Sequence, residues 1–484
     1  MTRDHRTRPP HGARITMTGS PSGLFGELFV DGEMALAMSD RALLHGMLGF
    51  EAMLASALEA ESVAPQGTAD VITRQCDPDL YDIAEIGRAA TLAGNPAIPL
   101  VKALTARVAA VAPKHAKWVH FGATSQDVID SGYVHVLGCG LKLIDLRLGR
   151  LAEAMRALAE THRTTPMIGR TFLQQAVPIT FGVKTALWLD PLLESRHVLH
   201  DILAAPAVQL AGAAGTLAAL GGDGDRVQAR FVELTFGAES SLIPWHAQRH
   251  RIARLAAELG ILTGNLGKIA RDIGLMAQTE ISEVAEPEAP GKGGSSAMPH
   301  KRNPVLCTLI LAAAQRAPGL VATMLSALPH EHERALGGWH AEWPTLPELF
   351  KVTGSALAQT ITLIEGLQVF PERMRANIDL TQGLVMSERV SLALAAALGK
   401  ANAHHLLEEA SRACVAQQRH LHEVLAEMPA VTAHLDAASL ADLFDPTTYR
   451  GASDAIIDRV LARCAQAPVP REAAPAREYR IIDA

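Results

Sequence analysis

The chain has 484 residues, of which 48% are hydrophobic but 4% are aromatic, so its core must be filled mainly by aliphatic side chains. This composition favours packed helices over sheets, because alanine, leucine and methionine form helices readily whereas strands prefer aromatic and β-branched residues. The formal net charge of −7 and the lack of a basic tract interleaved with aromatic residues argue against nucleic-acid binding.

The chain divides into five predicted segments, and its length alone is compatible with about two to four domains. The basic N-terminus is not followed by an apolar run, which predicts a disordered leader rather than a secretion signal. Glycine and proline clusters near residues 95 and 371 indicate boundaries. We expect a leader over 1–22, an N-terminal helical domain over 23–116, a central long-helix bundle over 117–370, a C-terminal helical domain over 371–467 and a tail over 468–484.

Two stretches of the predicted bundle carry apolar residues every three or four positions, as one face of a long helix does. No strand-like alternation of comparable length competes with this pattern. The Ala/Gly-rich stretch 203–222 is too weakly apolar for a membrane span. The expected fold class is therefore all-α. The periodic residues are Leu148, Leu151, Met155 and Leu158, and then Leu262, Leu266, Ile269, Ile273 and Met276.

Two segments carry polar residues that the core of a bundle would not select. The first, HFGATSQDVID (His120–Asp130), reads by itself as a helix start, with Thr124 or Ser125 as the N-cap and Asp127 in the first turn. The second, GRTFLQQAVPITFG (Gly169–Gly182), reads by itself as a proline-broken helix with Arg170 in solvent.

The run GSSAMPHKRNP (Gly294–Pro304) combines glycines, hydroxyls and cations just before an apolar helix. Asn303 suits the N-cap and Pro304 the first helical position. Backbone donors and the helix dipole would then favour an anion, and a carboxylate fits best. A simple connector between elements is the alternative reading of such a loop.

In order and type, these three segments resemble the signature regions of the fumarase/aspartase superfamily, and the likeness extends from about residue 24 to 460. The resemblance implies three helical domains with a central long-helix bundle. It also implies a homotetramer in which each active site draws its three regions from three subunits. Neither a cofactor, nor a metal, nor a membrane or nucleic-acid partner is implied.

Within the superfamily the chain is most similar to the bacterial 3-carboxy-cis,cis-muconate cycloisomerases, through residues 34–55, 277–287 and 332–347. The last of these discriminates best, because adenylosuccinate lyases continue differently after HisGluArg. The resemblance implies a small tricarboxylate substrate and a place in protocatechuate (beta-ketoadipate) degradation. Trp339 and Trp343 in that segment also read as packing anchors.

The resemblance further implies roles for individual residues. Ser295 would transfer the proton, while Lys301 and Asn303 would stabilise the negative charge that develops on a substrate carboxylate. Further residues would bind or orient the substrate, with Arg389 and His340 as weaker candidates. The substrate-binding set is His120, Thr124, Ser125, Arg170, Thr171, Gln174, Ser296, His300, Arg302 and Arg334.

One position departs from the lyase pattern. Phe172 stands where argininosuccinate and adenylosuccinate lyases have a histidine that serves as general acid, and phenylalanine cannot donate a proton. A carboxylate leaving group, with a pKa of about 4, has little need of an acid. The substitution therefore favours lactone chemistry over C–N cleavage. The alternatives are an adenylosuccinate-lyase-like enzyme that releases fumarate and a helical structural protein without activity.

Other candidate metal or disulfide residues read more simply as structural. His330 and His332, and likewise His404, His405 and Glu408, fit solvated helix faces better than a metal site. The scattered cysteines form no CxxC pair, which indicates a reduced, cytoplasmic compartment. They are Cys76, Cys139, Cys307, Cys414 and Cys464.

Overall fold

The structure is a computed structural model that describes residues 23–26, 28–235, 241–288, 298 and 301–466. The predicted leader over 1–22 and the tail over 468–484 lie outside these residues. So do Ser295, Ser296 and His300 of the glycine-rich run.

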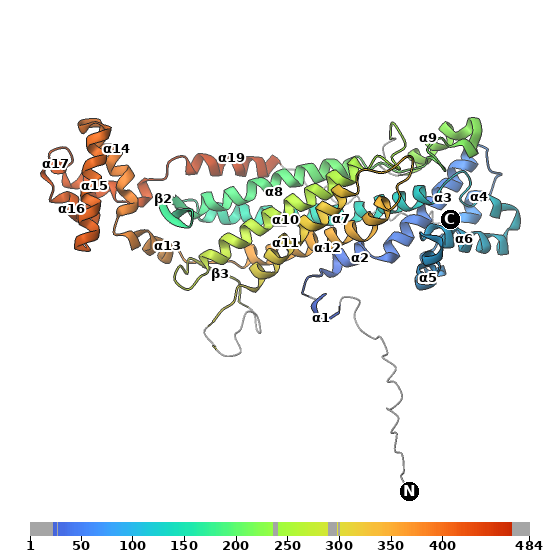
Figure 1. Ribbon diagram of the computed structural model, residues 1–484, viewed down its shortest axis with the longest axis horizontal. Helices are drawn as coiled ribbons and strands as arrows, with labels where there is room; N and C mark the ends of the chain where they lie inside the picture. The colour runs from blue at the N-terminus through green and yellow to red at the C-terminus, as the bar shows by residue number, and fades with distance from the viewer. Residues whose placement is uncertain (1–22, 27, 236–240, 289–297, 299–300, 467–484) are drawn as a thin grey trace, which may run out of the picture.

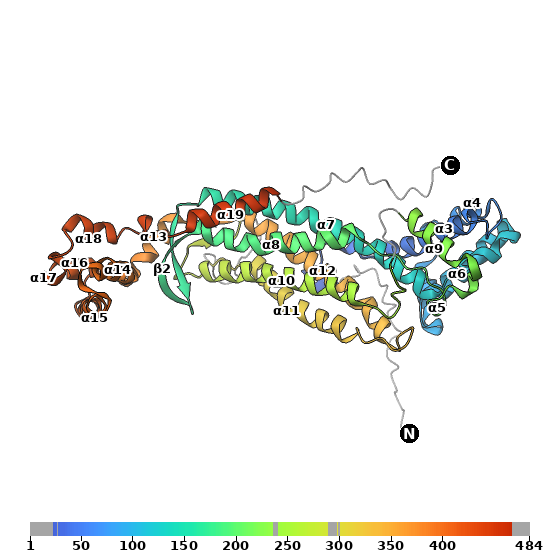
Figure 2. The same cartoon turned by 90° about the horizontal axis from the view of Figure 1, so that it is seen from above.

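The described chain is elongated, with long helices side by side in the middle and a smaller helical group at each end (Figure 1). The same arrangement is seen from above in Figure 2. The all-α prediction is confirmed, and the periodic residues of the bundle are buried, apart from Leu158, which is half-buried. The long helices are α7 (Ser125–Thr161), α8 (Phe181–Ala204), α10 (His250–Met276), α11 (Val305–Ser326) and α12 (Gly338–Glu365).

The first end group packs around α3 (Asp40–Ala60), which crosses α7 closely because Gly46 and Gly132 meet there. A Cβ on Gly46 would lie 2.7 Å from the Gly132 carbonyl oxygen. The shorter elements here are α4 (Thr68–Thr73), η1 (Pro78–Leu80), α5 (Ile83–Ala93), α6 (Ala97–Val111), η2 (Pro113–Trp118), η3 (Ala218–Asp223) and α9 (Gly224–Leu234). Two short helices precede α3, namely α1 (Gly23–Gly26) and α2 (Gly32–Ala37), and α2 packs on α7 and α12 of the bundle.

The second end group lies at the other end of the bundle, and its last helix, α19 (Ser453–Gln466), returns to pack on α8 (Figures 1 and 2). The buried apolar residues between Val390 and Leu440 form a cluster of their own. The domain boundaries stay a prediction. The remaining elements are α13 (Pro371–Ile378), η4 (Asp379–Thr381), η5 (Leu384–Met386), α14 (Ser387–Leu398), α15 (Lys400–Gln417), α16 (Leu421–Ala426), α17 (Pro429–Thr432), α18 (Ala437–Leu443) and η6 (Pro446–Thr448).

The second polar segment forms a β-hairpin, so its reading as a proline-broken helix is wrong. Strands β1 (Pro166–Thr171) and β2 (Gln174–Thr180) pair antiparallel, with Thr171 opposite Gln174. A two-stranded ribbon leaves each strand with one unpaired edge, so Pro178 is tolerated despite its missing N–H. A second short antiparallel pair joins β3 (Val284–Ala285), which precedes the glycine-rich run, to β4 (Gln368–Val369), which follows α12.

Helix α11 is strongly apolar, with a mean hydropathy of 1.6 over its most apolar window. In the part of the chain that is described, it is the one helix long and apolar enough to cross a membrane by length and composition. Only 22% of its most apolar window is buried within the chain. Most of its large apolar side chains are buried or half-buried, and Leu325 is 47% exposed.

Candidate active site

The first polar segment shapes the start of α7, as predicted. Thr124 is the N-cap, and its backbone N–H donates to the Asp127 carboxylate over 3.0 Å. Arg334, which follows α11 by a short loop, donates to Thr124 Oγ1 over 3.1 Å and to Gln126 Oε1 over 3.1 Å. Ser125 begins the helix. The predicted residues Thr124, Ser125 and Arg334 therefore lie together.

His120 stands just before this cap. Its ring Nδ1 lies 2.6 Å from Oε1 of Glu51, and its backbone N–H donates to Oε2 of the same carboxylate over 3.0 Å. Burial disfavours the imidazolium, but the carboxylates of Glu51 and Asp127 outweigh burial and raise the pKa of His120 above its ordinary value. The imidazole therefore keeps its proton to a higher pH than an ordinary histidine does.

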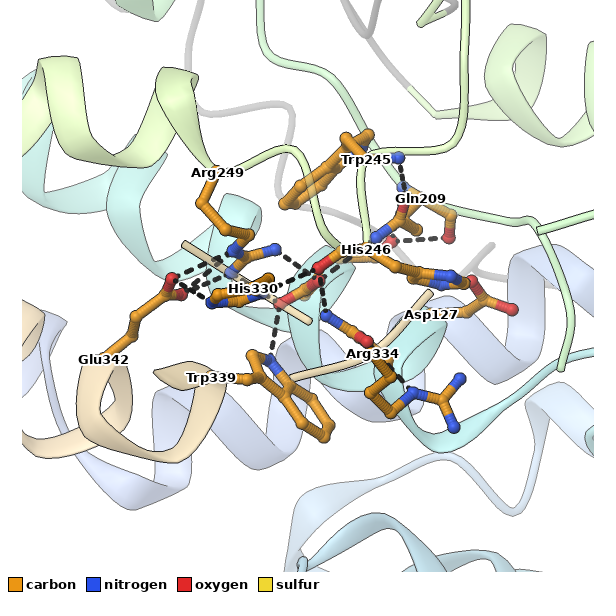
Figure 3. A network of polar contacts seen from close by, with 12 residues as sticks. Asp127, Gln209, Trp245, His246, Arg249, His330, Arg334, Trp339 and Glu342 are labelled. Carbon is orange, nitrogen blue, oxygen red and sulfur yellow. Dashed lines mark hydrogen bonds and ion pairs between the residues drawn. The ribbon is translucent and has the colours of Figure 1, made fainter. Parts of the chain in front are cut away.

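A buried network of charged residues supports this corner of the molecule (Figure 3). The Arg249 guanidinium, 4% exposed, makes a two-nitrogen contact with Asp130 at 2.8 and 3.1 Å and also pairs with Glu342. Trp339 Nε1 donates to Asp130 over 3.0 Å, so this tryptophan is the anchor that the sequence predicted. Because α7, α10 and α12 each supply or adjoin a member, the network joins three helices of the bundle.

Histidines take part in the same network. His246 Nε2 lies 2.7 Å from Asp127, whose carboxylate also accepts the N–H groups of Ala211 and Gly212. His330 has a fully buried side chain in the loop between α11 and α12, and burial lowers its pKa. The reading of His330 as part of a solvated helix face is therefore wrong. His404 and Glu408 do lie exposed on α15.

The hairpin carries a second group of predicted residues. Arg170 donates from both terminal nitrogens to the fully buried Glu283, at 2.9 and 2.7 Å, instead of lying in solvent. Asn377 on α13 donates to the same carboxylate over 2.9 Å, which fastens the hairpin to the rest of the chain. Thr171 and Gln174 are exposed at the hairpin end.

The hairpin tip is apolar and exposed. Phe172 is 100% exposed and Leu173 is 74% exposed, and both have positive φ values, of 50° and 65°. Residues other than glycine are disfavoured there, and turns of this kind usually carry asparagine and glycine. A strained apolar tip of this kind marks a candidate contact or binding element.

The start of α11 differs from the prediction. Its N-cap is Pro304 rather than Asn303, and the backbone N–H groups of Leu306 and Cys307 are bonded by the Glu286 carboxylate at 3.0 and 2.8 Å. Proline has no side chain that can accept a hydrogen bond, so a carboxylate from another segment fills that role. The negative charge at this helix N-terminus is therefore supplied by the Glu286 side chain.

The other cations of the run are placed nearby. Arg302 donates to the Glu286 carbonyl oxygen over 3.0 Å and pairs with Glu288 at 2.8 Å. Lys301 is exposed and Asn303 is half-exposed. The hairpin and the run are both fastened to one short segment, because Glu283 pairs with Arg170 and the Glu286 carbonyl oxygen accepts from Arg302, so their residues form one group.

Replacement of Glu286 by alanine is expected to lower the free energy of unfolding by about 1–2 kcal/mol, because two N–H groups of α11 lose their partner. Denaturant unfolding at fixed protein concentration measures the effect. Glu288→Ala is the matched control: its side chain is 69% exposed, so a change within about 0.5 kcal/mol is expected. Equal effects of the two substitutions would contradict the capping role.

The two groups of predicted residues lie at opposite ends of the bundle. His120, Thr124, Ser125 and Arg334 surround the N-terminus of α7, whereas the hairpin follows its C-terminus. Since α7 has 37 residues, its ends are about 55 Å apart. Figures 1 and 2 both place the hairpin far from α3. One copy of the chain does not bring the two groups together.

Two further candidates are structural within the chain. His340 Nε2 lies 3.1 Å from the Gly94 carbonyl oxygen, and its ring packs on Trp343 with centroids 4.4 Å apart. Arg389 donates to the carbonyl oxygens of Asp442 and Asp445 in the C-terminal group. Among the residues that the structure describes, histidine, cysteine, aspartate and glutamate side chains form no group of three or more that could hold a metal ion.

Comparison with known families identifies the chain. The lyase family matches residues 31–319, and the family described as adenylosuccinate lyase C-terminus matches residues 383–460. The first match covers more than half of the chain and includes the residues of both groups except Arg334. This chain belongs to the lyase family of the fumarase/aspartase superfamily.

Individual relatives agree with that assignment. A 3-carboxy-cis,cis-muconate cycloisomerase of Bradyrhizobium diazoefficiens is 47% identical over 92% of this chain and 99% of its own length. One of Pseudomonas aeruginosa is 48% identical over 91% of this chain and 96% of its own length. The crystal structure of the 3-carboxy-cis,cis-muconate lactonizing enzyme of Pseudomonas putida has a TM-score of 0.88 at 44% identity, covering 92% of this chain and all of that one.

Two residues of this lyase that support the α7 cap, Glu51 and Arg249, were not predicted from its sequence. The sequence does indicate Glu51, because it shares the buried face of α3 with Met47, Leu54 and Leu58. A charged residue on such a face needs a partner. Arg249 gave no such signal, because its partners Asp130 and Glu342 are distant in the sequence. The predicted roles of the site residues of this lyase stay predictions.

Proposed function

We propose that this chain interconverts 3-carboxy-cis,cis-muconate and 4-carboxymuconolactone, as a cytoplasmic enzyme of protocatechuate degradation. The observation that carries the proposal is the near full-length identity of 47–48% to cycloisomerases of that name. Phe172 supports it independently, because the exposed end of the hairpin offers no proton donor at that position.

The proposed chemistry needs a proton donor to carbon but no acid for the leaving group. One substrate carboxylate adds to a double bond and forms the C–O bond of the lactone, while Ser295 delivers a proton to the adjacent carbon. In the reverse direction the carboxylate departs as a stable anion, with a pKa of about 4. Lys301 and Asn303 stabilise the enolate-like carboxylate in between, because positioned donors act most strongly where charge develops.

The residues around the α7 cap bind the substrate in this proposal. Arg334 and a cationic His120 present positive charge beside Thr124 and Ser125, which suits a tricarboxylate. Arg170 and Arg302 are already paired with Glu283 and Glu288, so their main contribution is to hold the hairpin and the base of the run. Thr171 and Gln174 at the hairpin end, with Ser296 and His300 of the run, complete the proposed binding set.

We infer that the enzyme works as a homotetramer with sites shared between subunits. The separation of about 55 Å between the two residue groups supports this inference, because the proposed catalytic residues lie in one group and several of the proposed substrate-binding residues lie in the other. Helix α11 supports it as well, because 22% of its most apolar window is buried in one copy and association would remove more of this helix from water.

Mixing two inactive variants tests the shared site. Arg334→Ala and Lys301→Ala alter opposite ends of the bundle, so a mixed oligomer contains some sites with both native residues. Co-refolded variants are expected to turn over substrate above either parent. The control pair Arg334→Ala with His120→Ala alters a single end and should recover no activity. Equal recovery in both mixtures, or none in either, would contradict the shared site.

The second candidate is an adenylosuccinate-lyase-like enzyme, favoured by the match of residues 383–460 to an adenylosuccinate lyase C-terminus. Ultraviolet absorbance separates the two functions. Loss of the muconate chromophore supports the cycloisomerase, and release of fumarate from adenylosuccinate supports the rival. An intact oligomer that is inactive on both substrates would instead favour a structural protein.

A further inference from the structure

Glu51 is a buried carboxylate whose ion-pair partner among the described residues is a histidine, with neither a lysine nor an arginine beside it. Its side chain is 0% exposed in the apolar core of α3. Burying a carboxylate costs several kcal/mol unless it is paired and hydrogen-bonded. The carboxylate uses both oxygens on His120, one on the ring and one on the backbone N–H.

His120 is constrained in a second, independent way. Its φ of 59° lies in the left-handed region, which is uncommon and strained for a residue with a side chain. The bond from its backbone N–H to Glu51 holds this conformation. Strained residues of this kind persist where the surrounding structure fixes them, and they occur often at functional sites.

The ring has one end fixed and the other end available. Nδ1 faces Glu51, and the side chain remains 17% exposed. In the described part of the chain, Nε2 has no hydrogen-bond partner that competes with a ligand. The charged groups that face His120 are Glu51 from α3 and Asp127 from α7, both negative, so they favour the protonated ring.

We propose that Glu51 is a positioning residue that holds His120 with Nδ1 inward and its Nε2–H directed at a carboxylate of the substrate. The inference rests on the proposed function and extends it by one residue. Glu51 acts through His120 and does not itself touch the substrate. The bond from Nε2 is charge-assisted while the ring is protonated.

The substitution Glu51→Gln tests the role, because glutamine keeps the size and an acceptor for the backbone N–H but removes the charge. We expect kcat/KM for 3-carboxy-cis,cis-muconate at neutral pH to fall about 10- to 100-fold. The active form is the protonated ring, so activity is lost as pH rises through the pKa of His120. That loss should begin at lower pH in Glu51→Gln, because the raised pKa returns toward its ordinary value.

A purely structural role would not move the pH profile. Thr68→Val is the matched control, since it removes a 2.9 Å contact to the buried His115 in the same helical group without touching His120. It should lower stability and leave the pH profile unchanged. In a His120→Asn background, Glu51→Gln should have no further effect on kcat/KM. A wild-type pH profile in Glu51→Gln would overturn the proposal.

A readout without substrate separates this inference from the proposed function. Asparagine at 120 keeps a donor toward Glu51 but does not titrate. Because the pKa of His120 is raised on folding, the extra stability of the wild type over His120→Asn should be complete below about pH 6.5 and disappear as pH rises through the folded pKa. If the enzyme does not turn over 3-carboxy-cis,cis-muconate but the stability difference varies with pH in this way, the proposed function is wrong and the pairing of Glu51 with His120 is supported. A difference that does not vary with pH would overturn the pairing.

Discussion

Replacing Ser295 by alanine is expected to lower turnover of 3-carboxy-cis,cis-muconate by about 10²- to 10⁴-fold while the oligomer stays intact. The physical reason is that a carbon next to a carboxylate exchanges its proton slowly without a positioned donor. Lys301 and Asn303 would still stabilise the charged intermediate, so KM should change less than kcat. Loss of muconate absorbance measures the rate, and size-exclusion chromatography checks the assembly.

A serine far from both residue groups provides the control for this substitution. Ser439 lies exposed on α18 in the C-terminal group, where it contacts the N-cap Asp436 of the same helix. Ser439→Ala should keep the wild-type rate. If Ser295→Ala also turns over at a near-normal rate, Ser295 has no part in the proton transfer and the proposed mechanism is wrong.

Replacing Arg249 by methionine is expected to lower the free energy of unfolding by about 3–5 kcal/mol. The substitution leaves Asp130 and Glu342, 2% and 6% exposed, as buried carboxylates without their cation. Burial disfavours the charged guanidinium, but the two carboxylates outweigh burial and raise the pKa of Arg249, so it stays charged throughout the working range. Thermal and denaturant unfolding at one protein concentration measure the loss.

An exposed arginine on the same bundle provides the comparison. Arg150 pairs with Glu365 at 2.6 Å, but the two side chains are 65% and 37% exposed. Arg150→Met should therefore cost no more than about 1 kcal/mol. A similar cost at both positions would show that burial does not set the strength of these pairs. Activity of Arg249→Met should fall as well, because Arg249 holds Asp130 directly beneath the α7 cap.

Local patterns in the sequence predicted several elements correctly. The three-to-four periodicity of α7 and α10 predicted long helices, because a helix repeats its buried face at that spacing. Thr124 with Asp127 predicted the start of α7, because capping depends on residues close in sequence. The apolar run from Val305 predicted α11. Its cap was assigned to Asn303, however, whereas the carboxylate that bonds its first N–H groups comes from Glu286.

The hairpin was missed because its two strands are short and their alternation is weak. Pro178 and the neighbouring helices suggested a broken helix, but pairing between Thr171 and Gln174 stabilises strands instead. Pairing between strands depends on contacts across the turn, which a propensity argument for one segment does not include. The positive φ values at Phe172 and Leu173 are visible in the structure alone.

The sequence by itself determined the all-α class, the starts of long helices and the three polar segments that assign the chain to its superfamily. These depend on residue order and on interactions within a few turns. Tertiary structure decided which charges meet, including Glu51 with His120, Arg249 with Asp130 and Arg170 with Glu283. It also decided that the site residues form two separate groups, because one group lies at each end of the long helix α7. Partners of this kind are separated by many residues, and folding alone brings them within reach of a hydrogen bond.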